Sequence, residues 1–229
     1  MDSKVINIFN NISTKYDLYN DLFSLGLHRI WKRKLLSLIK PKNNEKWLDL
    51  CCGTGDLTIL IAKSIQPNGI VTGVDYSKNI LSLAMQKAKR SELSNIIWKL
   101  DDVLTIDLPE NSFNGISISY GLRNLNNIEY ALKKIYNLLK PNGRIGLLDF
   151  NHNKLGSIPS LFQSYYLRRI VVPITSLSGL EYEYSYIEDS IQLFPQRDEL
   201  IKISKDIGFQ NISFKTLMFS QMCAVVLIK

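Results

Sequence analysis

A short apolar run that leads into two closely spaced glycines constrains the fold of this chain more than any other feature. Residues 46–52 have the pattern of a buried strand, Gly53-Thr-Gly55 forms a turn, and residues 56–65 carry apolar side chains on one helical face. Strands that alternate with helices form a parallel sheet with helices on both faces. The sequence therefore predicts an α/β, doubly wound, Rossmann-like sheet. The alternation continues with strands expected over 70–75, 95–100, 113–120 and 144–150, and with helices over 77–90 and 128–139.

The end of the chain departs from this alternation. A helix expected over 195–207 stops at Gly208, and the strands expected over 212–218 and 222–228 are joined by a short turn. Because a short turn connects antiparallel strands, we expect the sheet to be mostly parallel with an antiparallel strand near the C-terminus.

Two segments lie outside the alternating core, and we expect them to belong to a single domain spanning residues 1–229. Residues 1–44 form a predicted N-terminal helical cap, with helices near 5–12 and 27–39. Residues 151–194 form a predicted lid-like insertion that is rich in aromatic residues.

Cysteine usage and hydropathy limit the type of protein. Cys51 and Cys52 are adjacent and Cys223 is isolated, which gives neither a disulfide framework nor the paired spacing of a metal site. The sequence has no run of about 18 apolar residues that would predict a membrane-spanning helix, and its N-terminus lacks the pattern of a secretory signal. We therefore expect a soluble protein that holds no metal, in the cytoplasm or, if it is encoded by an organelle, in the plastid stroma.

The charge balance indicates an anionic partner. Lysine and arginine total 28 against 21 acidic residues, a net charge of +7. The excess favours contact with nucleic acid or with a membrane surface, unless the lysines only form a solvated face.

Carboxylates follow successive strands of the predicted sheet. Asp49, Asp75 and Asp102 lie at strand ends, and the glycines at 53 and 55 let a ligand approach the backbone closely. Asp75 is at the position from which a carboxylate binds the ribose hydroxyls of an adenosine, and Asp102 suits the adenine amine. The pattern predicts a nucleotide-type site at this edge of the sheet.

Two features distinguish the ligand. A dinucleotide fingerprint requires a third glycine where this chain has Thr58, and Asp56 places negative charge where a pyrophosphate would lie. Asp49 and Asp56 suit instead the ammonium and sulfonium groups of S-adenosylmethionine, which we predict as the cofactor.

Several segments carry family signatures: FNNISTKYD over 9–17, SLGLHRIWK over 24–32, LDLCCGTGD over 48–56, ISYGLRN over 118–124 and LLKPNG over 138–143. Together they resemble the quinone-biosynthesis C-methyltransferases across nearly the whole chain. The resemblance implies a class I methyltransferase that methylates a ring carbon of a lipophilic quinol. It also implies cofactor contacts at Thr54, Asp75, Asp102, Val103 and Ser119, beside those expected of Asp49, Gly53 and Gly55.

The amino-acid sequence of residues 26–32 is most similar to that of the cyanobacterial and plastid branch of this family. The implied acceptor is 2-phytyl-1,4-naphthoquinol, with demethylmenaquinol or a ubiquinol precursor as alternatives. Two positions depart from the family pattern, Cys51 in place of a glycine and Asn142 in place of the commoner glycine.

Four residues are candidates for the chemistry. Arg123 follows the fourth strand and could stabilise a phenolate oxygen, unless it pairs with a surface carboxylate. Tyr16 and His28 are candidates for proton transfer, with His152 as a further histidine after the fifth strand.

The aromatic segment over 158–187 suggests a lid over a lipophilic substrate, or a packed cap with no substrate contact. Arg168 and Arg169 within it suggest peripheral contact with anionic lipid.

Two other classes stay open. A nucleic-acid methyltransferase is the runner-up, although segment 119–123 lacks the Asn/Asp-Pro-Pro-aromatic motif of amine-methylating enzymes. A non-catalytic protein that binds the cofactor is the third. The sequence does not indicate the oligomeric state.

Overall fold

The computed structural model describes residues 16–176 and 181–229 and centres on a seven-stranded sheet. The strand order is β3-β2-β1-β4-β5-β7-β6, and the pairs among β1 to β5 are all parallel. This arrangement confirms the predicted α/β, doubly wound sheet. The strands are β1 Lys46–Leu50, β2 Ile70–Asp75, β3 Ile96–Leu100, β4 Phe113–Ser119, β5 Leu139–Phe150, β6 Asn211–Leu217 and β7 Met222–Ile228.

The predicted antiparallel strand is β7, which pairs antiparallel with both β5 and β6. In this register Phe150, at the end of β5, lies opposite Met222, at the start of β7. The β6–β7 turn therefore lies at the same edge of the sheet as the carboxyl ends of the parallel strands.

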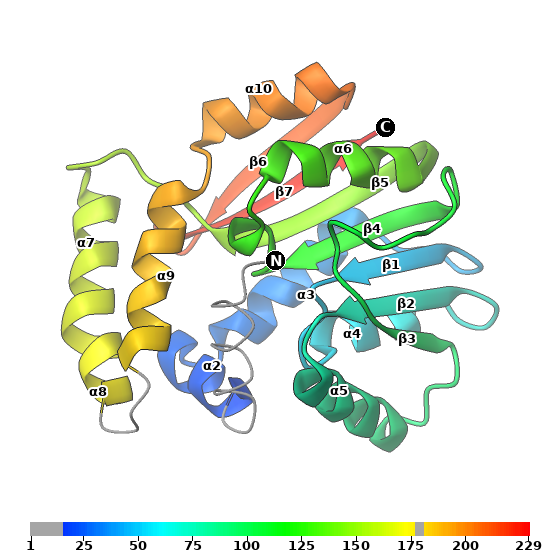
Figure 1. The fold of residues 1–229 in the computed structure, drawn as a ribbon, viewed down its shortest axis with the longest axis horizontal. Helices are drawn as coiled ribbons and strands as arrows, with labels where there is room; N and C mark the ends of the chain where they lie inside the picture. Colours follow the sequence, from blue (N-terminus) through cyan, green and yellow to red (C-terminus); the bar gives the residue numbers. More distant parts are fainter. Residues whose placement is uncertain (1–15, 177–180) are drawn as a thin grey trace.

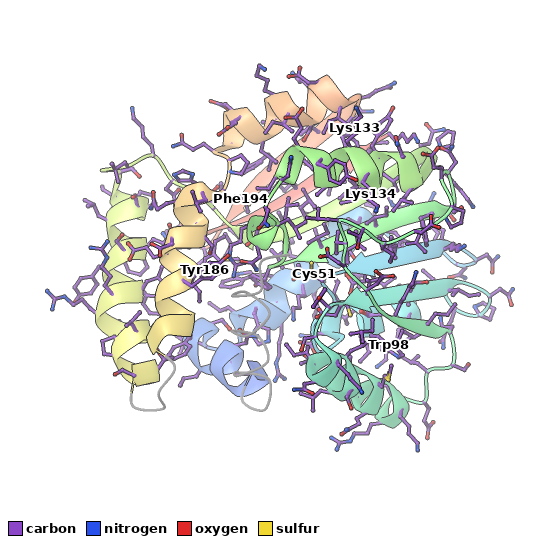
Figure 2. All side chains as sticks on the ribbon, in the orientation of Figure 1. Cys51, Trp98, Lys133, Lys134, Tyr186 and Phe194 are labelled. Carbon is purple, nitrogen blue, oxygen red and sulfur yellow. The ribbon has the colours of Figure 1, made fainter. Side chains whose placement is uncertain are left out.

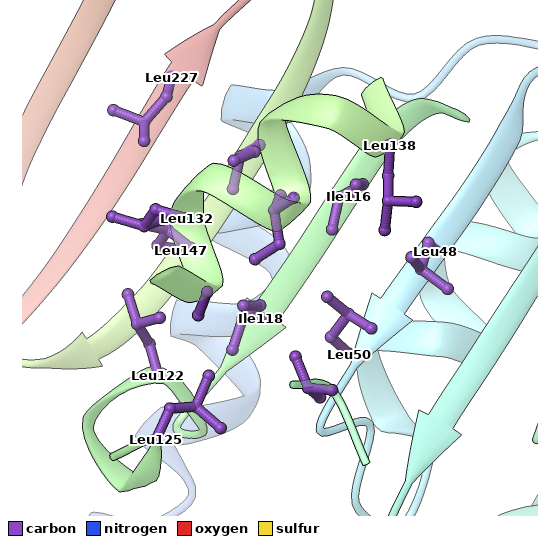
Figure 3. Close-up of a cluster of buried hydrophobic side chains, with 14 of the residues drawn as sticks. Leu48, Leu50, Ile116, Ile118, Leu122, Leu125, Leu132, Leu138, Leu147 and Leu227 are labelled. Carbon is purple, nitrogen blue, oxygen red and sulfur yellow. The ribbon is translucent and has the colours of Figure 1, made fainter. Parts of the chain in front are cut away.

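Helices cover both faces of the sheet. One buried apolar cluster joins β4, β5 and β7 to α6 and α10, and Figure 3 shows Leu132 and Leu138 of α6 directed at Ile116, Ile118 and Leu147. A second cluster joins α3 and α4 to the opposite face. The helices against the sheet are α3 Leu27–Ile39, α4 Asp56–Ser64, α5 Lys78–Arg90, α6 Ile128–Leu138 and α10 Arg197–Ile207.

The remaining helices lie beyond the carboxyl ends of the parallel strands, on the left in Figure 1. Leu167, Val171 and Ile191 form a small cluster there with Phe23 and Phe150. We call these elements the cap: α2 Tyr16–Ser24, α7 Ile158–Tyr166, the π-helical turn η3 Leu167–Val171, α8 Val172–Ser176 and α9 Glu181–Leu193.

Several boundaries differ from the predictions for local reasons. β1 ends at Leu50 because Cys51 has a left-handed backbone, with φ 53°. β5 begins at Leu139 rather than at 144, so residues 141–143 lie inside this strand, where the register against β4 shifts between Phe113 and Gly115. The helix expected near 5–12 lies outside the described residues.

Ser77, the first residue of the helix expected over 77–90, caps α5. Its side chain accepts a hydrogen bond from the backbone N–H of Ile80, and the helix runs from Lys78 to Arg90.

Within residues 16–176 and 181–229, no helix has the length and apolarity required to cross a membrane.

Candidate active site

A hollow lies where β1, β2, β3 and β4 end, and we call it the strand-end hollow. Asp75 holds its loop in place, because its carboxylate accepts hydrogen bonds from the backbone N–H groups of Gly53 at 2.8 Å and Ser77 at 3.0 Å. Burial raises the pKa of Asp75 although these bonds oppose the change. The lining residues are Cys51, Gly53, Asp75, Tyr76, Ile80, Asp101, Asp102, Val103, Ser119, Tyr120, Gly121, Asn124 and Leu125.

The chemistry of this lining fits an adenosine. Asp75 and Asp102 supply carboxylate acceptors for hydroxyl and amine groups, and Tyr76 adds an aromatic ring. The Ser119 hydroxyl is buried and has no hydrogen-bond partner among the described residues. Because a buried hydroxyl without a partner costs free energy, the Ser119 hydroxyl is one of the polar groups in this lining that a ligand would satisfy.

Asp49 and Asp56, the carboxylates that suggested a cationic ligand, do not line the hollow. Asp49 is 1% exposed and accepts hydrogen bonds from Thr58 and Ser117, each at 2.5 Å. Burial raises its pKa to about 6, against the effect of those two bonds. Thr58, which replaces the third glycine of a dinucleotide fingerprint, therefore orients Asp49 beneath the loop.

Asp56 is bound by two lysines. Lys32 lies 2.9 Å and Lys87 2.7 Å from its carboxylate. Burial alone would raise the pKa of Asp56, but the two charges outweigh it and hold the pKa well below its usual range.

Thr54 and Gly55 also lie outside the lining. Thr54 accepts a hydrogen bond from Lys87 at 3.1 Å, which ties the loop to α5. Gly55 has φ 80°, and a Cβ there would lie 2.8 Å from the ring of Trp98, so close packing requires this glycine.

A second, larger cavity of about 320 Å³ lies between the strand ends and the cap, and we call it the apolar cavity. Most of its wall is hydrophobic and aromatic, which is typical of a pocket for an apolar ligand. Figure 2 shows Tyr186 on the side of α9 that faces the sheet, where it contributes to this wall. The lining residues are Asn20, Phe23, Ser24, Leu25, Leu27, His28, Trp31, Tyr120, Arg123, Asn124, Phe150, Phe162, Gln163, Tyr166, Leu167, Val171, Tyr186, Ile187, Met218, Gln221 and Met222.

Tyr120 and Asn124 line both the strand-end hollow and the apolar cavity. The Asn124 side-chain oxygen is buried without a hydrogen-bond partner among the described residues. Ligands in the two spaces would therefore meet at this shared wall.

Arg123 lies on the 3₁₀ turn η2 Leu122–Asn124 and lines the apolar cavity. Its Nη1 donates to Asp149 Oδ1 at 2.6 Å and to the Tyr120 carbonyl at 2.8 Å, and its Nε donates to Ser190 Oγ at 3.2 Å. Its partner is thus a buried carboxylate and not the surface carboxylate considered from the sequence. Nη2 makes no hydrogen bond with any described residue, so the N–H groups of this atom of the guanidinium are left to donate to a ligand.

The two histidines differ in position. His28 is 5% exposed, lines the apolar cavity and lies with Nδ1 2.8 Å from Ser24 Oγ. His152 lies outside the lining, with Nδ1 2.5 Å from the Phe194 carbonyl. Tyr16 begins α2, but its side chain lies outside the described residues.

Several residues that line the strand-end hollow or the apolar cavity were not predicted from the sequence. Tyr76 and Asp101 directly adjoin the predicted carboxylates, so their place next to a strand end was a usable signal. Met218, Gln221 and Met222 carry no local signal, because only the antiparallel register of β7 brings their turn to the cavity. Among residues 16–176 and 181–229, no three His, Cys, Asp or Glu side chains lie together as a metal site would require.

A mostly parallel sheet of this order, with a nucleoside-type hollow and an adjoining apolar cavity, defines a Rossmann-like methyltransferase. Solved structures share the fold: a SAM-dependent methyltransferase from Aquifex aeolicus matches with a TM-score of 0.62 at 16% identity, covering 86% of this chain and 88% of that one. A protein from Methanococcus maripaludis described as a putative S-adenosyl-L-methionine-dependent methyltransferase matches with a TM-score of 0.64 at 14% identity, covering 95% and 91%.

Relatives in sequence are closer. A 2-phytyl-1,4-naphtoquinone methyltransferase of Nostoc sp. strain PCC 7120 is 36% identical over 230 residues, which cover 100% of both chains. A demethylmenaquinone methyltransferase of Geobacillus sp. strain WCH70 is 33% identical over 220 residues, which cover 95% of this chain and 93% of that one. The model of the ubiE/COQ5 methyltransferase family matches residues 1–229, and the chain belongs to this family. Membership confirms the predicted resemblance, the methyltransferase class and, with it, S-adenosylmethionine as the methyl donor.

Proposed function

We propose that this enzyme methylates a ring carbon of a prenylated quinol, and that its acceptor is 2-phytyl-1,4-naphthoquinol. The observation that carries the proposal is the apolar cavity, which shares Tyr120 and Asn124 with the strand-end hollow and presents Arg123 to its interior. The activities for which these relatives are named support a quinone ring as the acceptor. Demethylmenaquinol and a ubiquinol precursor are the alternative acceptors.

Bound S-adenosylmethionine supplies an activated methyl group. Because methyl transfer from a sulfonium needs no Lewis acid, we predict that the enzyme is active without a metal ion. The protein must orient the ring, exclude water and stabilise charge on the ring oxygen. Asp75, Asp102, Val103 and Ser119 would hold the adenosine, with Gly53 shaping the loop. The cap closes the cavity with hydrophobic side chains, and this shared enclosure also supports a single domain over residues 1–229.

Arg123 is the residue we propose for stabilising the ring oxygen. Its Nε and Nη1 are fixed by Ser190, Asp149 and the Tyr120 carbonyl, which leaves Nη2 to donate to a developing phenolate. A donor held in this way needs no reorganisation during the reaction, which is the property that makes such groups effective.

Proton transfer is assigned to His28 or Tyr16. His28 lines the apolar cavity, which favours it, whereas His152 is engaged by the Phe194 carbonyl away from the cavity.

We also propose peripheral contact with an anionic membrane through α7. Its exposed apolar residues Ile158, Leu161, Phe162 and Tyr165 have helical spacing that places them on one face, and Phe162 also lines the apolar cavity. Of the two arginines that follow, Arg168 donates to Glu188 at 2.7 Å, so the exposed Arg169 is the one with its charge available for lipid. Location in a cytoplasm or plastid stroma is likewise a proposal.

The decisive experiment incubates the enzyme with tritiated S-adenosylmethionine and an equimolar mixture of reduced 2-phytyl-1,4-naphthoquinone, demethylmenaquinone and RNA. We expect label in the organic extract, with the phytylated ring as the main product. Label in menaquinol, the methylated product of demethylmenaquinol, would select the alternative acceptor, and label in the RNA pellet would overturn the proposal in favour of a nucleic-acid methyltransferase. Absence of any transferred label would favour a protein that only binds the cofactor.

A further inference from the structure

The two ring nitrogens of His28 have different surroundings. Nδ1 lies 2.8 Å from Ser24 Oγ, and Ser24 Oγ lies 2.5 Å from the backbone carbonyl of Asn20. Nε2 makes no hydrogen bond with any described residue. The imidazole is buried and forms part of the wall of the apolar cavity.

The hydrogen bonds of the Ser24 hydroxyl determine which ring nitrogen of His28 carries the hydrogen. The Ser24 hydroxyl has one hydrogen, and two oxygens 2.5 Å apart repel each other unless that hydrogen lies between them. The hydroxyl therefore donates to the Asn20 carbonyl, and its oxygen accepts from Nδ1–H, as it also accepts from the His28 backbone N–H at 3.3 Å. A neutral imidazole with hydrogen on Nδ1 keeps its lone pair on Nε2.

The surroundings keep the ring neutral. Burial lowers the pKa of His28, and the charge of Lys32 lowers it further, with a smaller contribution from Arg29. Asp21 and Asp56 act in the opposite direction. Their effect is limited because Asp21 accepts hydrogen bonds from Arg29 and Asp56 is bound by two lysines.

We propose that Ser24 is a positioning residue that holds His28 as the Nδ1–H tautomer, so that Nε2 accepts the proton of the quinol ring hydroxyl. The proposal rests on the proposed function and selects His28 over Tyr16. The O–H bond of the ring breaks, its proton bonds to Nε2, and the electron pair stays on the oxygen beside Arg123. A ring carbon then bonds to the methyl group while the methyl–sulfur bond breaks toward sulfur. The methylated carbon loses its hydrogen to water as Nε2 returns its proton to the ring oxygen, so each turnover releases one proton.

The chain has two histidines, so the ring signals of His28 can be measured by NMR with little overlap. Long-range ¹H–¹⁵N spectra of the full chain labelled at histidine separate protonated from unprotonated ring nitrogens. We expect Nδ1 protonated and Nε2 unprotonated at His28. In Ser24→Ala we expect this preference to be lost, while His152, held by the Phe194 carbonyl, serves as the internal control and stays unchanged.

The kinetic arm uses the same proteins with reduced 2-phytyl-1,4-naphthoquinone. Loss of the base in His28→Gln is expected to lower kcat by about 10²- to 10⁴-fold. Ser24→Ala should lower kcat about 10-fold or more at an unchanged KM for S-adenosylmethionine, and Ser24→Thr, which keeps the hydroxyl, should restore most of it.

A wild-type spectrum with hydrogen on Nε2 overturns the proposal, as does a Ser24→Ala enzyme with an unchanged tautomer or normal kcat. Absence of quinol methylation by the wild type would contradict the proposed function instead. The spectra separate the two failures, because they are recorded without any acceptor.

Discussion

The guanidinium of Arg123 and the carboxylate of Asp149 form a buried ion pair, with Nη1 2.6 Å from Oδ1 and the side chains 8% and 2% exposed. Asp149, on β5, also accepts from the backbone N–H of Arg123 at 3.3 Å. The Phe150 ring lies 5.0 Å from the guanidinium carbon. The pair joins β5 to the turn after β4 and fixes the cation at the wall of the apolar cavity.

Removal of the Asp149 charge is predicted to destabilise the protein more than most substitutions. Asp149→Asn leaves Arg123 as a buried cation without a carboxylate, which costs about 3–5 kcal/mol and lowers Tm by roughly 6–20 °C in a chain of this size. Thermal unfolding followed by circular dichroism measures the change. Adding Arg123→Met should recover part of the loss, and strictly additive losses in the double variant would show that the two residues do not act as a pair.

Arg123 is predicted to act in the chemical step. Arg123→Lys keeps a cation for Asp149 but cannot hold Ser190, the Tyr120 carbonyl and a ring oxygen together. Single-turnover methylation at saturating cofactor should slow by about 10²- to 10³-fold, as for loss of an oxyanion donor. A near-normal rate would make Arg123 a structural residue. Calorimetry should find an unchanged affinity for S-adenosylmethionine.

Asp75 is predicted to carry much of the cofactor affinity. Charge-assisted hydrogen bonds to two ribose hydroxyls contribute about 1.5–3 kcal/mol each, so Asp75→Ala should weaken binding by more than tenfold in calorimetry. The matched control is Asp206→Ala, an exposed carboxylate on α10 that pairs with Lys202. Equal affinity of the Asp75 variant and wild type would remove this residue from the site.

Asp49 is predicted to make stability depend on pH. Its folded pKa of about 6 exceeds the ordinary value of 3.8, so the folded chain binds more protons than the unfolded chain between these values. Stability from this group therefore falls as pH rises from 3.8 to 6, by on the order of 3 kcal/mol. Urea unfolding at pH 4.5 and pH 7 should show Asp49→Asn gaining stability relative to wild type at the higher pH. A constant difference between the two proteins would contradict the shifted pKa.

Membrane contact is predicted to require the exposed face of α7. Ile158 is 84% and Leu161 62% exposed, so changing both to serine should cost little stability and weaken sedimentation with anionic vesicles. The control changes Leu193, which is 81% exposed at the end of α9, to serine. Equal binding of wild type to neutral and anionic vesicles at low salt would remove the electrostatic part of the proposal.

Local patterns predicted the sheet well. α3 over Leu27–Ile39 and β2 over Ile70–Asp75 have the boundaries expected from periodicity, because each is bounded by glycine, proline or a charged residue. The strand-end carboxylates Asp75 and Asp102 follow from the same reasoning, since parallel strands end at one edge.

Long-range pairing was beyond the sequence. The negative charge of Asp56 suggested a cationic ligand, but Lys32 of α3 and Lys87 of α5 reach it from distant parts of the chain. Glu188 likewise binds Arg168, which we expected from the sequence to contact anionic lipid. Asp149 was not a candidate at all, because its importance depends on a contact with Arg123 that spacing does not reveal.

Apart from their shared wall at Tyr120 and Asn124, the strand-end hollow and the apolar cavity are built mostly from different elements. The strand-end hollow is built mainly from the ends of β1 to β4, whereas most of the apolar cavity comes from α2, α3, α7, α9 and the β6–β7 turn. Substitutions in those outer elements can therefore accumulate in a lineage without disturbing the loop around Gly53. Over evolutionary time, such an enzyme can exchange one ring or tail for another while its methyl donor stays the same.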